Sequence, residues 1–195
     1  VEVNDDVAYT VDFFRVKGGE QHTYSFHSQA ENAYPVEGIE LSYQTEDGTP
    51  NTPYVGSYAD VNWPVGKDPV SPTNTANYFT KYPRGYSWMD KVRYDKELET
   101  GKIAVEFDVK DYRKAITDSR GIKLRMTQLN DFIPSEVAIV GGYVPQSSRN
   151  TPLPKTLDYV LVHREGKNLD TLFTTVLEPY KGNRYISEID SANIT

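Results

Sequence analysis

The chain has 195 residues, with 28 acidic and 21 basic side chains and a formal net charge of −7 at neutral pH. It contains no cysteine, which excludes disulfides, thiolate nucleophiles and sulfur-ligated zinc or iron, and its acidic balance argues against nucleic-acid binding. No apolar run approaches the roughly 18–20 residues of a membrane-spanning helix, and the length suits one domain with a real core.

The first clear pattern lies near the N-terminus. Apolar residues alternate with polar or small ones over residues 7–13 and again over residues 22–26, and Gly18-Gly19 lies between the two runs. Period-two alternation is typical of strands, and a glycine pair between two strands indicates a tight turn. The pattern predicts a β-hairpin over residues 8–28.

Residues 45–83 differ from the rest of the chain because prolines and aromatic residues interrupt any regular pattern. A connection of this length with little regular structure is usually a functional loop or a disordered one. Its aromatic residues favour an ordered loop that packs on the domain or on a neighbour. They are Tyr54, Tyr58, Trp63, Tyr78, Phe79 and Tyr82.

The remaining apolar runs also alternate with period two, and turn residues separate them. The predicted strands are Val36–Tyr43, Tyr86–Tyr94, Lys102–Val109, Gly121–Asn130, Val137–Val144, Leu157–Arg164, Thr171–Leu177 and Arg184–Ile189. Only Asp111–Asp118 has a helical pattern, and the loop Pro145–Pro154 is expected to cross between sheets. About ten strands predict an all-β, antiparallel β-sandwich over residues 1–195, with 45–83 as a loop insert.

Three stretches resemble the sheet domain of heparinase II/III-like polysaccharide lyases, the group that includes oligoalginate and heparan lyases. They are Val11–Gly19 with Gln21–His27, Gly85–Met89, and Phe173–Tyr180, and they occur in the family's order across nearly the whole chain. The resemblance implies a sandwich of the supersandwich type that follows a helical toroid. The chain starts at Val1 and ends in an apparent strand, so we expect a piece of a longer protein.

The resemblance also implies a reaction. Family members cleave uronate-containing polysaccharide by β-elimination, in which a base removes the C5 proton of a uronic acid and an acid protonates the leaving oxygen. We therefore expect this chain to form one wall of the substrate cleft, to meet an acidic polysaccharide and the upstream helical domain there, and to be inactive alone. Secretion, the periplasm or the cell surface is the implied location.

Two candidate site residues lie in the predicted hairpin. The resemblance makes Tyr9 a candidate catalytic tyrosine, and the hairpin would place it near His22. It also makes His22, rather than His27 on the opposite face, a candidate ligand of a structural zinc whose other ligands would lie upstream of Val1. The alternatives are a tyrosine with its ring in the core and a histidine hydrogen-bonded at a sheet edge.

Two further residues are candidate substrate ligands. Arg15 could hold a carboxylate or sulfate with its guanidinium fork, or it could form an ion pair with Asp12. Trp63, in the aromatic loop, is the second candidate. The aromatic rings of this loop could stack on sugar rings, fasten the loop to the sandwich, or pack on the missing toroid.

Two rival functions stay open. One is a carbohydrate-binding module without catalysis, and the other is a structural sandwich of a surface protein. The net charge argues against a sulfated ligand, and a less charged glycan such as alginate fits better. A basic strip could override this average if the fold brought its members together. Its members would be Lys81, Arg84, Lys91 and Arg93.

Overall fold

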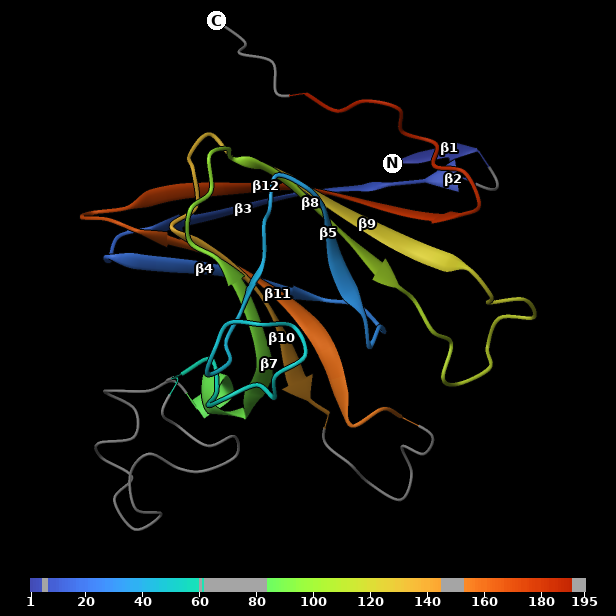
Figure 1. Cartoon of the computed structure of the whole chain (residues 1–195). Helices are drawn as coiled ribbons and strands as arrows, with labels where there is room; N and C mark the ends of the chain where they lie inside the picture. Colours follow the sequence, from blue (N-terminus) through green and yellow to red (C-terminus); the bar gives the residue numbers. More distant parts are fainter. Residues whose placement is uncertain (5–6, 60, 62–83, 145–152, 191–195) are drawn as a thin grey trace, which may run out of the picture.

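The structure, a computed structural model, describes residues 1–4, 7–59, 61, 84–144 and 153–190. Two five-stranded antiparallel sheets pack face to face, which confirms the predicted all-β sandwich (Figure 1). The described residues contain no α-helix, and no helix among them is long and apolar enough to cross a membrane.

Each strand of one sheet has a counterpart at the same position in the other. The first sheet has the order β3 (Thr10–Lys17), β12 (Asp170–Lys181), β9 (Ile122–Leu129), β8 (Lys102–Asp108), β5 (Ala33–Glu37). The second has the order β4 (Gln21–His27), β11 (Thr156–Glu165), β10 (Glu136–Tyr143), β7 (Met89–Asp95), β6 (Ser42–Tyr43). A ribbon of β1 (Glu2–Asn4) and β2 (Val7–Ala8) and a 3-10 helix η1 (Arg84–Trp88) complete the described elements.

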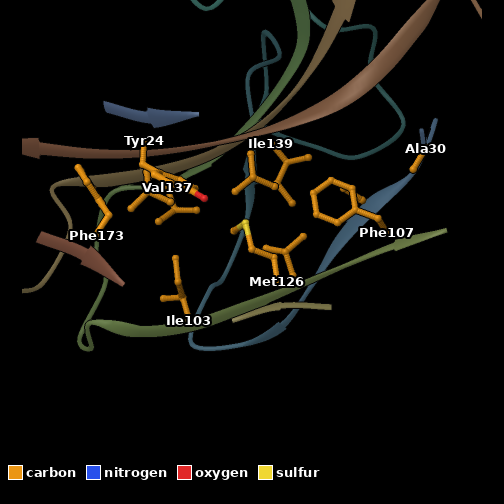
Figure 2. Close-up of a cluster of buried hydrophobic side chains, with 12 residues drawn as sticks. Tyr24, Ala30, Ile103, Phe107, Met126, Val137, Ile139 and Phe173 are labelled. Atoms are coloured by element: carbon orange, nitrogen blue, oxygen red, sulfur yellow. The ribbon is translucent and has the colours of Figure 1, made fainter. Parts of the chain in front are cut away.

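The core lies between the sheets, where every second residue of the central strands points inward. Ile103 and Phe107 of β8 pack there with Met126 of β9 against Val137 and Ile139 of β10 (Figure 2). All five are fully buried. Burial of a side chain of this size contributes about 1.5–3 kcal/mol, so this layer is the main source of cohesion between the sheets.

The predicted hairpin over residues 8–28 is wrong, although both of its strands exist. β3 pairs with β12 in one sheet and β4 pairs with β11 in the other, so Gly18 and Gly19 carry the chain between the sheets. Both glycines have positive φ, 89° and 79°, which suits either kind of tight connection. The local signal is therefore the same for both, and pairing with sequence-distant strands decides the outcome.

Other boundaries also differ from the prediction. Gly38, with φ of 69°, separates β5 from β6 inside the predicted strand 36–43, and residues 86–88 are 3-10 helix. Residues 111–118 form turns rather than a helix. Residues 145–152 of the loop expected to cross between sheets lie outside the described residues, but the strands on its two sides, β10 and β11, are neighbours in one sheet.

The predicted strand Arg184–Ile189 is absent because a buried carboxylate holds this segment in another conformation. Glu178 is 3 % exposed. Its Oε2 accepts hydrogen bonds from the Arg184 guanidinium at 2.8 and 2.9 Å, and its Oε1 accepts from the backbone N–H groups of Tyr185 and Ile186. These bonds fold the segment back toward the first sheet.

Five connections join the strands that hold equal positions in the two sheets. The antiparallel registers place all five at one end of the sandwich. They span residues 18–20, 38–41, 96–101, 130–135 and 166–169. Two of them are in backbone contact, since Asn130 N–H donates to the Gly101 carbonyl at 3.1 Å. A Cβ on Gly101 would lie only 2.4 Å from the carbonyl oxygens of Asn130 and Phe132.

This contact generates a prediction. Gly101→Ala should lower the free energy of unfolding by about 1–3 kcal/mol or more, because backbone atoms cannot move aside as a flexible side chain can. Gly85→Ala is the matched control, since a Cβ there meets nothing within 4 Å. Denaturant unfolding measures both variants, and equal stability of the two would contradict the close packing of the connections.

Candidate functional site

Tyr9 and His22 are not brought together. Tyr9 precedes β3, is partly buried, and donates its backbone N–H to the Val1 carbonyl at 2.9 Å. His22 contacts Thr171, near the start of β12, whereas the start of β3 pairs with β12 at Leu177. The two residues are therefore about 20 Å apart along the strand direction. The expected neighbourhood of Tyr9 and His22 fails together with the hairpin.

His22 is 6 % exposed and both of its ring nitrogens have partners within the chain. Nε2 lies 2.5 Å from the Gly18 carbonyl oxygen, which can only accept, so Nε2 carries a proton. Nδ1 lies 2.8 Å from the Thr171 hydroxyl, which also accepts from Arg164 at 3.1 Å. This arrangement braces the connection after β3 against β12.

Zinc would have to displace those partners. Among the described residues no group of three histidine, cysteine, aspartate or glutamate side chains could hold a metal ion. A structural zinc site is closed by four ligands, and His22 has no fellow ligand here. The contacts favour the alternative of a hydrogen-bonded histidine at a sheet edge, and zinc with ligands from outside this chain stays a prediction.

Arg15 points outward from β3 and is held by a carboxylate on the neighbouring strand. Its Nε and Nη2 donate to the two carboxylate oxygens of Asp170 at 2.8 and 2.7 Å. These hydrogen bonds lower the pKa of Asp170 to about 2. The guanidinium N–H groups that would hold a substrate anion are therefore already hydrogen-bonded to Asp170. The alternative pair with Asp12 does not form, because Asp12 and Arg15 are three residues apart on β3 and face opposite sides, and Asp12 accepts from the Tyr24 hydroxyl at 3.2 Å.

The aromatic loop can be followed only in part. Trp63, with residues 62–83, lies outside the described residues. The first part of the loop is ordered on the sandwich: the Tyr58 hydroxyl donates to Glu136 at 2.7 Å, and its ring meets Tyr86 edge-on at 5.0 Å. Tyr58 packs on the outer face of the second sheet. This part therefore fastens the loop to the domain.

A different group of residues gathers on the inner face of the second sheet, at the end away from the five connections. In Figure 1, β7, β10 and β11 extend there and diverge from β3, β12 and β9. Gly141 of β10 pairs with Asp90 of β7 and with Asp158 of β11, so the three lie in one row. A Cβ on Gly141 would lie 2.6 Å from Oδ1 of Asp90, so glycine leaves room for this carboxylate.

A β-bulge brings a lysine to the same face. The β7–β10 register shifts between Ile139 and Gly141, and Lys91 has a φ of 51°. Its Cδ lies 3.6 Å from the position of a Cβ on Gly141. A bulge commonly redirects a side chain in this way. Val92 joins the apolar cluster on the opposite face, and Arg93 returns to the inner face.

Two exposed aromatic residues complete the group. Trp88 is 49 % and Tyr143 44 % exposed, and their rings meet edge-on with centroids 6.1 Å apart. The Tyr143 hydroxyl donates to Oδ2 of Asp90 at 3.3 Å. We call Trp88, Asp90, Lys91, Gly141 and Tyr143 the Trp88–Tyr143 site.

Some charged groups at the site have ion-pair partners and others have none among the described residues. The Arg93 guanidinium donates to Asp158 at 2.8 Å, and Asp158 also accepts from the Ala33 N–H. Lys91, by contrast, is exposed and forms no ion pair with any described residue. Burial raises the pKa of Asp90, and Lys91 opposes this shift. Oδ1 of Asp90 is buried and has no hydrogen-bond partner among the described residues.

The sequence carried only a partial signal for this site. Trp88, Lys91 and Arg93 lie within one predicted strand, where simple alternation puts all even-numbered residues on one face. The bulge at Lys91 breaks that alternation. Of the proposed basic strip, Lys91 and Arg93 share a face, but Asp158 neutralises Arg93. Lys81 lies outside the described residues, as does the side chain of Arg84.

No protein-family model, curated protein or solved structure matches this chain.

The contacts of His22 generate a prediction. His22→Ala should lower the free energy of unfolding by about 1–3 kcal/mol, because the Thr171 hydroxyl and the Gly18 carbonyl lose a buried partner. His27→Ala is the control, since His27 is exposed, and among the described residues it makes one 3.5 Å hydrogen bond and a ring contact with Tyr159 at 4.4 Å. It should cost about 1 kcal/mol or less.

The same unfolding curves test the zinc expectation. Added zinc ions should leave the midpoint of the unaltered chain unchanged if His22 acts through Gly18 and Thr171 alone. A zinc-dependent rise in the midpoint that His22→Ala abolishes would contradict that role and would support a metal ligand.

Proposed function

We propose that this chain is a glycan-contacting β-sandwich, and that its Trp88–Tyr143 site holds a uronate-containing polysaccharide. The observation that supports this most is the exposed Trp88–Tyr143 pair beside Lys91 and Oδ1 of Asp90, which have no ion-pair or hydrogen-bond partner, respectively, among the described residues. Aromatic faces stack on the apolar faces of pyranose rings and orient them without charge.

The polar groups beside the rings suit the rest of such a ligand. A carboxylate oxygen accepts hydrogen bonds only, so the partly buried Asp90 carboxylate beside Tyr143 can accept a hydrogen bond from a sugar hydroxyl. Lys91 donates three N–H groups and carries the positive charge that a uronate carboxylate requires. Gly141 lets Asp90 and Lys91 pack over the centre of the row, because a side chain there would collide with the Asp90 carboxylate.

In a polysaccharide lyase of the kind that the chain resembles, the site would form part of one wall of the cleft. It would bind and orient the glycan, while an upstream helical domain would supply the groups that move protons. Tyr9 and His22 do not support catalysis by this chain alone, because they lie apart and His22 is fully hydrogen-bonded.

A second function that the same observations support is that of a binding module, which holds the glycan and never cleaves it. Both functions use the same site and differ in whether product forms. A purely structural sandwich would need neither the exposed rings nor Lys91.

Binding is tested by calorimetric titration with uronate hexasaccharides. Trp88→Ala and Tyr143→Ala should each weaken binding about two- to thirteenfold, because each loses a stacking face worth about 0.5–1.5 kcal/mol. Phe13→Ala is the matched control: Phe13 is 66 % exposed, lies on β3 and is outside the site. Equal losses in all three variants, or no binding by the unaltered chain, would contradict the proposal.

Catalysis is tested separately by the ultraviolet absorbance of the unsaturated uronate product. The chain alone should bind alginate or heparan sulfate without forming product. A version extended upstream of Val1 should form it if the lyase expectation is right. Product from the chain alone would contradict the assignment of proton transfer to an upstream domain, and binding without product from either version would favour the binding module.

A further inference from the structure

We infer that the Trp88–Tyr143 site selects a polyuronate with one carboxylate per sugar and no sulfate, and that Lys91 is the residue that determines this specificity. The inference rests on the proposed function, since it assumes that a glycan occupies this site. It concerns which glycans the site accepts and which it rejects.

The first step is a balance of charges around Lys91. Among the described residues, the carboxylates whose pKa Lys91 lowers include Asp90, Asp158 and Glu31. Two of them already have cationic partners. Arg93 lies 2.8 Å from Asp158, and Lys110 lies 2.9 Å from Glu31.

What remains is one positive and one negative group, Lys91 and Asp90. Both sit over Gly141, which places them side by side rather than on opposite faces of the sheet. The other exposed lysine described at this end of the sheet, Lys155, precedes Thr156, which pairs with Tyr143, so alternation places the Lys155 side chain on the opposite face. The site can therefore neutralise one anionic group of a sugar and accept a hydrogen bond from a hydroxyl group next to it.

A polyuronate matches this pattern, because each sugar carries one carboxylate and otherwise hydroxyl groups. Its carboxylate can pair with Lys91 while a hydroxyl donates to Asp90. A sulfated glycan places further anions where hydroxyls would be, and those anions would meet the carboxylate of Asp90. Like charges at short range across a partly buried site repel, since water screens them poorly there.

The bulge makes Lys91 a determinant of specificity rather than an incidental surface lysine. Without the extra residue, regular alternation would put Lys91 and Asp90 on opposite faces of β7. Its positive φ is costly for a residue with a side chain and is uncommon outside glycine, asparagine and aspartate. The backbone thus adopts an unusual conformation at the position that delivers the cation to the aromatic pair.

The test compares three hexasaccharides by calorimetric titration at low ionic strength: an unsulfated polyuronate, a heparin-derived fragment, and neutral cellohexaose. The polyuronate should bind at least tenfold more tightly than either of the others. Lys91→Met should lower polyuronate affinity to that of cellohexaose and leave cellohexaose affinity unchanged. Asp90→Asn should raise the affinity for the heparin-derived fragment.

Lys167→Met is the matched control, because Lys167 is exposed in the connection of residues 166–169 at the other end of the sandwich. It should leave all three affinities unchanged, and circular dichroism checks that each variant is folded.

The outcomes separate two failures. If no hexasaccharide binds, the proposed function fails and the inference with it. If binding occurs but the heparin-derived fragment binds most tightly, or Lys91→Met does not change the preference, the glycan site stands and the inferred specificity is overturned.

Discussion

Contact between the inward faces of the two sheets is the constraint on which the rest of this structure depends. Each sheet must supply an apolar residue at every second position of its central strands, and β8 shows the result: Ile103 and Phe107 are fully buried and point inward, whereas Glu106 points outward. There the Glu106 carboxylate accepts hydrogen bonds from the hydroxyls of Tyr34 and Tyr180. Inter-sheet packing thus sets the face, and hence the chemistry, of the residues in the regular part of each central strand.

The connections between the sheets follow from the same constraint. Strands that hold equal positions in the two sheets are joined at one end. The connections there lie close together and contact one another through backbone atoms. Gly101 permits two connections to touch, and His22 braces a third by bonding to Gly18 and Thr171. A histidine that resembles a metal ligand in sequence thereby has a structural role in the fold.

At the opposite end the sheets diverge (Figure 1), and β5 of the first sheet bonds to the inward face of the second through the Ala33 N–H and Asp158. Polar and aromatic residues replace the apolar layer there: Asp90, Arg93, Asp158 and Tyr143 follow the buried residues of the same strands. The candidate site is thus an extension of the core face into solvent. Rigid neighbouring strands hold its members, which is the arrangement that binding sites on β-sandwiches require for fixed geometry.

The sequence by itself determined the fold class and the positions of most strands, because period-two alternation is local and strong in β8 to β12. It also located the unusual loop, of which Tyr58 anchors the first part. Strand partners were decided only by the tertiary structure. Gly18-Gly19 serves a hairpin and a connection between sheets equally well, and sequence-distant β11 and β12 settle the choice. For the same reason the site could not be read from the chain: Trp88, Lys91 and Tyr143 meet only through the β7–β10 register, and a single bulge residue decides which face Lys91 occupies.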